Sequence, residues 1–282
     1  MTTKASIFPM IIIGILFFIF GFVTWLNGSL IPFLKVICNL TEFQALFVTF
    51  AFYIRIAYTV MALPMAYVLE RTGYKNGMAL GLGVMVVGSL LFIPAAQTAN
   101  FIIFLIALFT LGTGLTILQT ASNPYVVLIG PIESAAMRIS IMGLINKGAG
   151  VVVPLLFTAL IFSDMGDIST DLSNAEIDEL ASRLIIPYIA MAIVLTGLMA
   201  LVKFSNIPEL TFEKEDAYDQ GSIFRFPRVI LGAVALFFYV GIEVIAGDTI
   251  GLYAQGLEVA NATALTSYTM MFMVLGYLVG VF

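Results

Sequence analysis

The side chains best suited to chemistry are amides and hydroxyls in the stretch Gly112–Tyr125, which ends a long apolar run. Thr116, Gln119 and Asn123 recur at i, i+3 and i+7, so a helix would place them on one face. An amide left without a hydrogen-bond partner in hydrocarbon costs roughly 1–3 kcal/mol. This face therefore predicts either polar contacts between helices or one wall of a cavity for a polar substrate.

Three charged residues, Lys147, Glu243 and Asp248, also fall inside apolar runs. A charge at the centre of a bilayer costs roughly 2.5–3.5 kcal/mol on insertion scales, which makes each a functional candidate. Glu243 and Asp248 are five residues apart, so on a straight helix they point about 140° away from each other. Lys147 has two interpretations, a permanent ion pair with Asp248 or a part in substrate binding and ion coupling.

The composition predicts an all-α integral membrane protein. Of the 282 residues 61 % are hydrophobic and 10 % are charged, with a mean hydropathy of +1.09. A bilayer-spanning helix needs roughly 20 apolar residues. The expected spans are about 8–34, 43–68, 77–96, 100–126, 139–163, 184–204, 228–254 and 264–282.

Few classes of chemistry fit the remaining composition. The chain has no histidine and a single cysteine, Cys38, which argues against disulfides, histidine proton relays and most zinc sites. No motif of an enzyme, a metal centre or a phosphate-binding loop is visible, so we expect neither catalysis nor a cofactor nor nucleic-acid binding. The first apolar run lacks the features of a cleaved signal peptide and is expected to be a retained span.

The distribution of cations predicts the topology. Eight of the twelve Lys and Arg residues flank spans on the side that also holds the N-terminus, while only Lys35 and Arg183 lie on the other. The positive-inside rule then places the N-terminus and the 206–226 loop in the cytoplasm and the acidic 163–183 loop outside. The predicted organisation is a six-span bundle (1–204), a cytoplasmic linker (205–227) and the start of a second bundle (228–282).

Several segments together resemble one transporter family. Glu70–Lys75 is similar to the cytoplasmic loop motif of the major facilitator superfamily, with substitutions at three of its positions. More specific segments resemble the bacterial glucose/galactose transporters, a branch close to the proton-coupled fucose permeases. These segments are Gly21–Gly28, Leu118–Pro124, Gly130–Ala135, Arg138–Lys147 and Tyr239–Thr249.

The resemblance implies a major facilitator fold, here a six-helix N-terminal bundle plus the first two spans of the C-terminal bundle. It implies a monomeric secondary active transporter of the bacterial inner membrane that takes up a hexose by cation symport with alternating access. The family has twelve spans, so we expect this chain to be a fragment. The alternative interpretation is a truncated, non-transporting membrane protein that binds sugar or acts as a sensor.

The resemblance also suggests roles for individual residues. Sugars require fixed hydrogen-bonding groups and an apolar ring surface. We expect the hydrogen-bonding groups from Asn27, Gln119, Asn123 and Asn146 and the ring surface from Trp25, the only tryptophan. The residues expected to couple transport to a cation, either H⁺ or Na⁺, are Glu243, Asp248 and Lys147.

One departure from the family concerns coupling. The fucose branch carries acids at the positions of Gly28 and Gln119, where this chain has none. Phe17–Gly21 and Phe237–Gly241 form a short internal repeat, and its register aligns Gly28 with Asp248. The acid is therefore expected to have moved to the repeat-equivalent span. Arg55, a surplus charge in the second span, is assigned to structure or snorkelling.

The predicted topology is testable by cysteine labelling in intact cells. A membrane-impermeant thiol reagent should label Ser173→Cys, in the loop expected outside, and leave Ser222→Cys, in the loop expected inside, unmodified until the cells are opened. The reverse pattern would refute the orientation.

Overall fold

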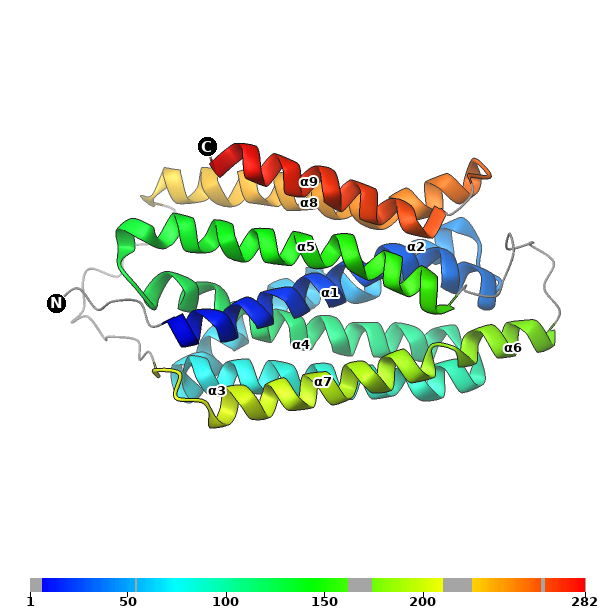
Figure 1. Ribbon diagram of the computed structural model, residues 1–282, viewed down its shortest axis with the longest axis horizontal. Helices are drawn as coiled ribbons and strands as arrows, with labels where there is room; N and C mark the ends of the chain where they lie inside the picture. Colours follow the sequence, from blue (N-terminus) through cyan, green and yellow to red (C-terminus); the bar gives the residue numbers. More distant parts are fainter. Residues whose placement is uncertain (1–6, 54, 162–173, 210–224, 260–261, 282) are drawn as a thin grey trace.

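The computed structural model describes residues 7–53, 55–161, 174–209, 225–259 and 262–281, and every regular element in these ranges is a helix. The helices run along the long axis of an elongated bundle (Figure 1). They are α1 (Ile7–Ile37), α2 (Glu42–Tyr53), α3 (Arg55–Thr98), α4 (Phe101–Leu128), η1 (Ile132–Ser134), α5 (Ala135–Ile161), α6 (Asn174–Ser182), α7 (Ile185–Phe204), α8 (Pro227–Gly256), η3 (Ala262–Ala264) and α9 (Leu265–Val281).

The helices follow the predicted apolar runs. Within the described residues six helices are long and apolar enough to cross a membrane, and Leu265–Leu278 forms a shorter apolar helix. The predicted span 43–68 is divided between α2 and the start of α3, and α3 then continues through 77–96 with a break in its helical backbone at Gly73. The all-helical membrane fold is confirmed.

Gly73 adopts a left-handed conformation with φ 77° and ψ 170°, which a residue with a Cβ atom rarely adopts. A Cβ atom there would also collide with the carboxylate of Glu209. The segment after α7 is tied to this corner, because Lys75 Nζ donates to Ser205 O at 2.6 Å and Tyr125 OH donates to Pro208 O at 2.9 Å.

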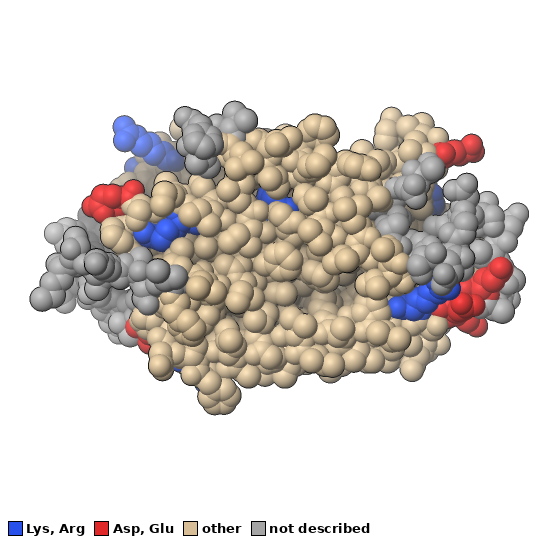
Figure 2. Space-filling model, in the orientation of Figure 1, with Lys and Arg blue, Asp and Glu red and all other residues tan. Residues whose placement is uncertain are grey.

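The helices from α1 to α7 pack around α1, α3 and α4. Helix α3 lies against α4 and α7, while α1 lies against α5, and α8 and α9 cover the side formed by α5 and α1 (Figure 1). The described Lys, Arg, Asp and Glu side chains gather near both ends of the molecule, and the belt between them is almost uncharged on the face seen in Figure 2. This distribution is the one expected of a helical bundle in a bilayer.

Arg138 closes the turn between α4 and α5. It is 5 % exposed, and its guanidinium donates to the carbonyls of Val126, Val127, Gly130 and Pro131 and to the Ser134 hydroxyl. The last carbonyls of a helix have no partner within the helix, so the cation both satisfies them and opposes the negative end of the helix dipole. The sequence indicates a cation near the cytoplasmic side at Arg138 but not this structural role.

Several expectations fall on residues that the structure leaves undescribed. Most of the 163–183 and 206–226 loops lies in these gaps, although the end of the first loop forms α6. Nothing is described of the Arg55 side chain, nor of Ile54, which separates α2 from α3. The division into two bundles stays a prediction.

The single cysteine lies just beyond α1. Its thiol donates to the Ala99 carbonyl at 3.5 Å, and burial raises the pKa of the Cys38 thiol to about 11. The thiol is therefore protonated at neutral pH and reacts slowly with thiol reagents, since the thiolate is the reactive form. This low reactivity keeps the native background small in the labelling experiment.

Candidate functional site

Trp25 lies where α1 meets α5, α8 and α9. Its side chain is 1 % exposed, and two glycines make room for the ring. A Cβ atom on Gly150 of α5 would lie 2.7 Å from Trp25 Cδ1, and one on Gly247 of α8 would overlap the other edge of the indole. Met270 of α9 contacts the same two positions. The ring therefore fixes how closely these four helices approach one another.

Polar and charged groups surround this ring. Trp25 Nε1 donates to Asn146 Oδ1 at 3.4 Å, and Asn146 Nδ2 donates to the Phe17 carbonyl at 3.3 Å. Lys147 Nζ lies 4.4 Å from the centroid of the Trp25 ring, within the range of a cation–π interaction. We call Trp25, Asn146, Lys147 and Glu243 the Trp25 cluster.

Lys147 and Glu243 form a buried ion pair between α5 and α8, with side chains 7 % and 11 % exposed. Each charge compensates the other in a place where neither could remain alone, and removing one partner of such a pair typically costs roughly 3–5 kcal/mol. The ion pair considered from the sequence, Lys147 with Asp248, is therefore not the one formed. Helix α8 is continuous over Pro227–Gly256, so its two carboxylates diverge as the spacing predicts.

Asp248 is completely buried and points elsewhere. Both of its carboxylate oxygens lack a hydrogen-bond partner within the described part of the chain. The Thr49 hydroxyl of α2 faces the carboxylate, but the pair does not reach hydrogen-bonding geometry, and this hydroxyl is also unpaired there. Thr49 was not predicted, because in the sequence it is only a hydroxyl within an apolar run.

The polar face of α4 is only partly directed into the protein. Thr116 is buried and donates to its own helix at the Gly112 carbonyl, over 2.8 Å. Gln119 is half-buried and Asn123 is exposed. Asn27 lies in α1, but its side chain is outside the described residues, so all three stay predictions as sugar ligands.

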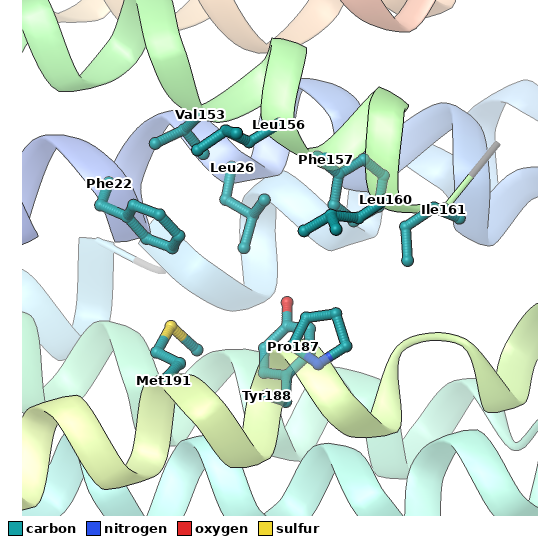
Figure 3. A pocket seen from close by; sticks show the side chains of 10 residues that line it. All are labelled: Phe22, Leu26, Val153, Leu156, Phe157, Leu160, Ile161, Pro187, Tyr188 and Met191. Carbon is teal, nitrogen blue, oxygen red and sulfur yellow. The ribbon is translucent and has the colours of Figure 1, made fainter. Parts of the chain in front are cut away.

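Apart from these contacts, the bundle has an apolar hollow. It lies between α5 and α7, with α1 behind it (Figure 3). We call it the α5–α7 groove, and its volume is about 460 Å³ including the part that is open to the outside. It is lined by Phe22 and Leu26 of α1, by Val153, Leu156, Phe157, Leu160 and Ile161 of α5, and by Pro187, Tyr188 and Met191 of α7.

Comparison with protein families gives one match over almost the whole chain. Residues 13–282 match the family described as Major Facilitator Superfamily. A glucose/galactose transporter of Brucella abortus is 36 % identical over 243 residues, which are 86 % of this chain and 57 % of that protein. A putative glucose/galactose transporter of Helicobacter pylori is 35 % identical over 247 residues, 86 % of this chain and 58 % of its own length.

More distant similarity extends to fucose transport proteins. The L-fucose-proton symporter of Escherichia coli is 27 % identical over 277 residues, 93 % of this chain and 63 % of that protein. The crystal structure of FucP in the outward conformation superposes with a TM-score of 0.76 at 26 % identity, covering 98 % of this chain and 71 % of that chain. The chain thus spans somewhat more than half the length of the curated relatives it matches.

The packing around Trp25 generates a stability prediction with a control on the same helix. Gly150→Ala places a methyl group against Trp25 and should cost about 1–3 kcal/mol of unfolding free energy, with a shift in the emission of the only tryptophan. Gly148→Ala meets nothing within 4 Å and should leave both quantities nearly unchanged. Thermal unfolding and tryptophan fluorescence in detergent measure both effects, and equal behaviour of the two variants would contradict this packing.

Proposed function

Because this chain belongs to the major facilitator superfamily, we propose that it works in the uptake of a hexose of the glucose/galactose type, coupled to H⁺ or Na⁺. The observation that carries the proposal is the Trp25 cluster, in which an indole, an amide and an ion pair meet between α1, α5 and α8. The setting is the bacterial inner membrane, with the N-terminus in the cytoplasm and the protein acting as a monomer.

The cluster has the chemistry that a sugar site needs. An aromatic ring offers its face to the apolar side of a pyranose, while amide and charged groups exchange hydrogen bonds with the hydroxyls. In the described conformation Trp25, Asn146, Lys147 and Glu243 satisfy one another, so the site is closed. A sugar would replace these internal contacts with its own hydroxyls as α8 moves away from α1 and α5.

Cation coupling is assigned to Asp248 together with the Lys147–Glu243 pair. An ionised carboxylate in an apolar interior costs several kcal/mol unless a positive charge accompanies it. Asp248 lacks an ion-pair partner within the described residues, so it requires a proton or a metal cation. Thr49 on α2 offers one further oxygen, which makes the site sensitive to the distance between α2 and α8.

Alternating access would act on the same contacts. In alternating access, a sugar or cation shifts the balance between the inward-open and outward-open conformations only when it binds them with different affinities. The Lys147–Glu243 pair connects α8 to α5, and the approach of Asp248 to Thr49 connects α8 to α2. Both contacts therefore depend on how α8 is placed. A cation at Asp248 and a sugar at Trp25 would therefore favour the same movement.

The sugar site is tested by removing its amides. Asn146→Ala and Gln119→Ala should each weaken glucose or galactose binding by about 1–3 kcal/mol, because a polar group of the sugar or of the site then stays unpaired. Calorimetry on detergent-purified protein measures the affinity, with thermal unfolding as the check on folding. The control is Gln97→Ala, an exposed amide near the end of α3. Wild-type affinity in both test variants would place the sugar elsewhere.

Coupling is tested through the cation dependence of binding. Galactose affinity should change with pH or with Na⁺ in the wild type, whereas Asp248→Asn, which is permanently neutral, should bind with an affinity independent of both. Asp178→Asn, an exposed acid on α6, should keep the wild-type dependence. Titrations with Na⁺ or choline at several pH values identify which cation acts. Full dependence in Asp248→Asn would remove this residue from the mechanism.

A further inference from the structure

The α5–α7 groove lies within the membrane-spanning part of the bundle. Its ten lining residues are apolar except for Tyr188, and α5 and α7 form its two walls instead of packing closely together (Figure 3). Leu156 and Leu160 on the rim are 48 % and 62 % exposed. In a bilayer such a hollow is filled by hydrocarbon, because water there would find too few hydrogen-bond partners.

Tyr188 adds a polar group inside the groove. The residue is 2 % exposed, and its ring stacks on Phe92 of α3 with centroids 3.7 Å apart and planes 10° from parallel. Its hydroxyl points into the groove (Figure 3). A hydroxyl that points into an otherwise apolar hollow can donate to a ligand there, so this position favours a ligand with an acceptor oxygen.

The guanidinium of Arg183 lies at one end of the groove. Arg183 Nη1 donates to the carbonyl of Ile161, a lining residue, over 3.0 Å. Its Nη2 contacts Glu179 at 3.1 Å, but that pair is open, with side chains 22 % and 64 % exposed. A guanidinium has five N–H donors, and exposed ion pairs are weak. Arg183 therefore retains capacity for an anion, and phosphate matches its planar donors well.

The guanidinium of Arg183, the hydroxyl of Tyr188 and the apolar part of the groove follow one another along the bundle. Arg183 precedes α7, Tyr188 is the fourth residue of α7, and Met191 lies nearly one turn further in. At about 1.5 Å per residue the cation and the hydroxyl are separated by roughly 5–8 Å along the axis. A glycerophospholipid presents the same order, from phosphate through ester oxygens to acyl chains.

From this order we propose that the α5–α7 groove is a binding site for an anionic glycerophospholipid of the surrounding bilayer. One acyl chain lies in the groove, an ester oxygen accepts from the Tyr188 hydroxyl, and the phosphate contacts Arg183. The proposal is independent of sugar uptake, since the groove contains no residue assigned to sugar or cation.

The probe is dioleoylphosphatidylglycerol, and the measurement is its retention by the purified protein in native mass spectrometry. Arg183→Gln should weaken retention about tenfold and Tyr188→Phe about fivefold, since each loses a hydrogen bond, the first of them charged. Leu156→Trp should block the groove. Its control is Leu155→Trp, a neighbour with nearly equal exposure, 46 %, that does not line the groove.

Further controls are Arg228→Gln and Tyr253→Phe, exposed residues on α8, which should retain the lipid as the wild type does. Thermal unfolding confirms that every variant is folded. Equal retention in the test and control variants would overturn the proposal. Two further results would overturn the proposal. If only Arg183→Gln lost lipid retention, or if glycerol phosphate displaced the lipid, the head group alone would be bound.

Discussion

The close approach of α1, α5 and α8 around Trp25 is the constraint on which the other features depend. The ring fits only because Gly150 and Gly247 have no side chains. Within a bilayer, helices gain little from the hydrophobic effect and associate through close packing and interhelical polar contacts. Around Trp25 both occur together, since the approach that the glycines permit also brings Lys147 to Glu243.

The charges inside the bundle are distributed unevenly as a result. Lys147 and Glu243 neutralise each other across α5 and α8, whereas Asp248, five residues further along α8, lies beside a single hydroxyl. One helix thus carries a compensated carboxylate and an uncompensated one. The first makes separation of α8 from α5 costly, because separation would leave two charges unpaired inside the membrane.

Features that depend on a single helix could be predicted from the sequence, whereas features that depend on how two helices pack together could not. Apolar length predicted the six described helices that can span a membrane, and the spacing of Glu243 and Asp248 predicted their divergence on α8. The partner of Lys147 depends on the register between α5 and α8, which no local pattern records. Thr49 and Arg138 were missed for the same reason, since their importance comes from a distant carboxylate and from the end of another helix. Asn123 shows the converse, because a shared helix face did not ensure burial.

The Trp25 cluster and the α5–α7 groove both contain residues of α1 and α5. On α1, Trp25 faces the cluster and its neighbour Leu26 faces the groove. On α5, Gly150 contacts the indole, while Val153 and Phe157, one and two turns further along, line the groove. A rigid shift of α5 against α1 therefore changes both places at once, because a close-packed helix interface cannot deform on one face alone. A lipid that holds the groove open would resist any movement of α5 toward α7. Opening of the proposed sugar site would then require mainly a movement of α8.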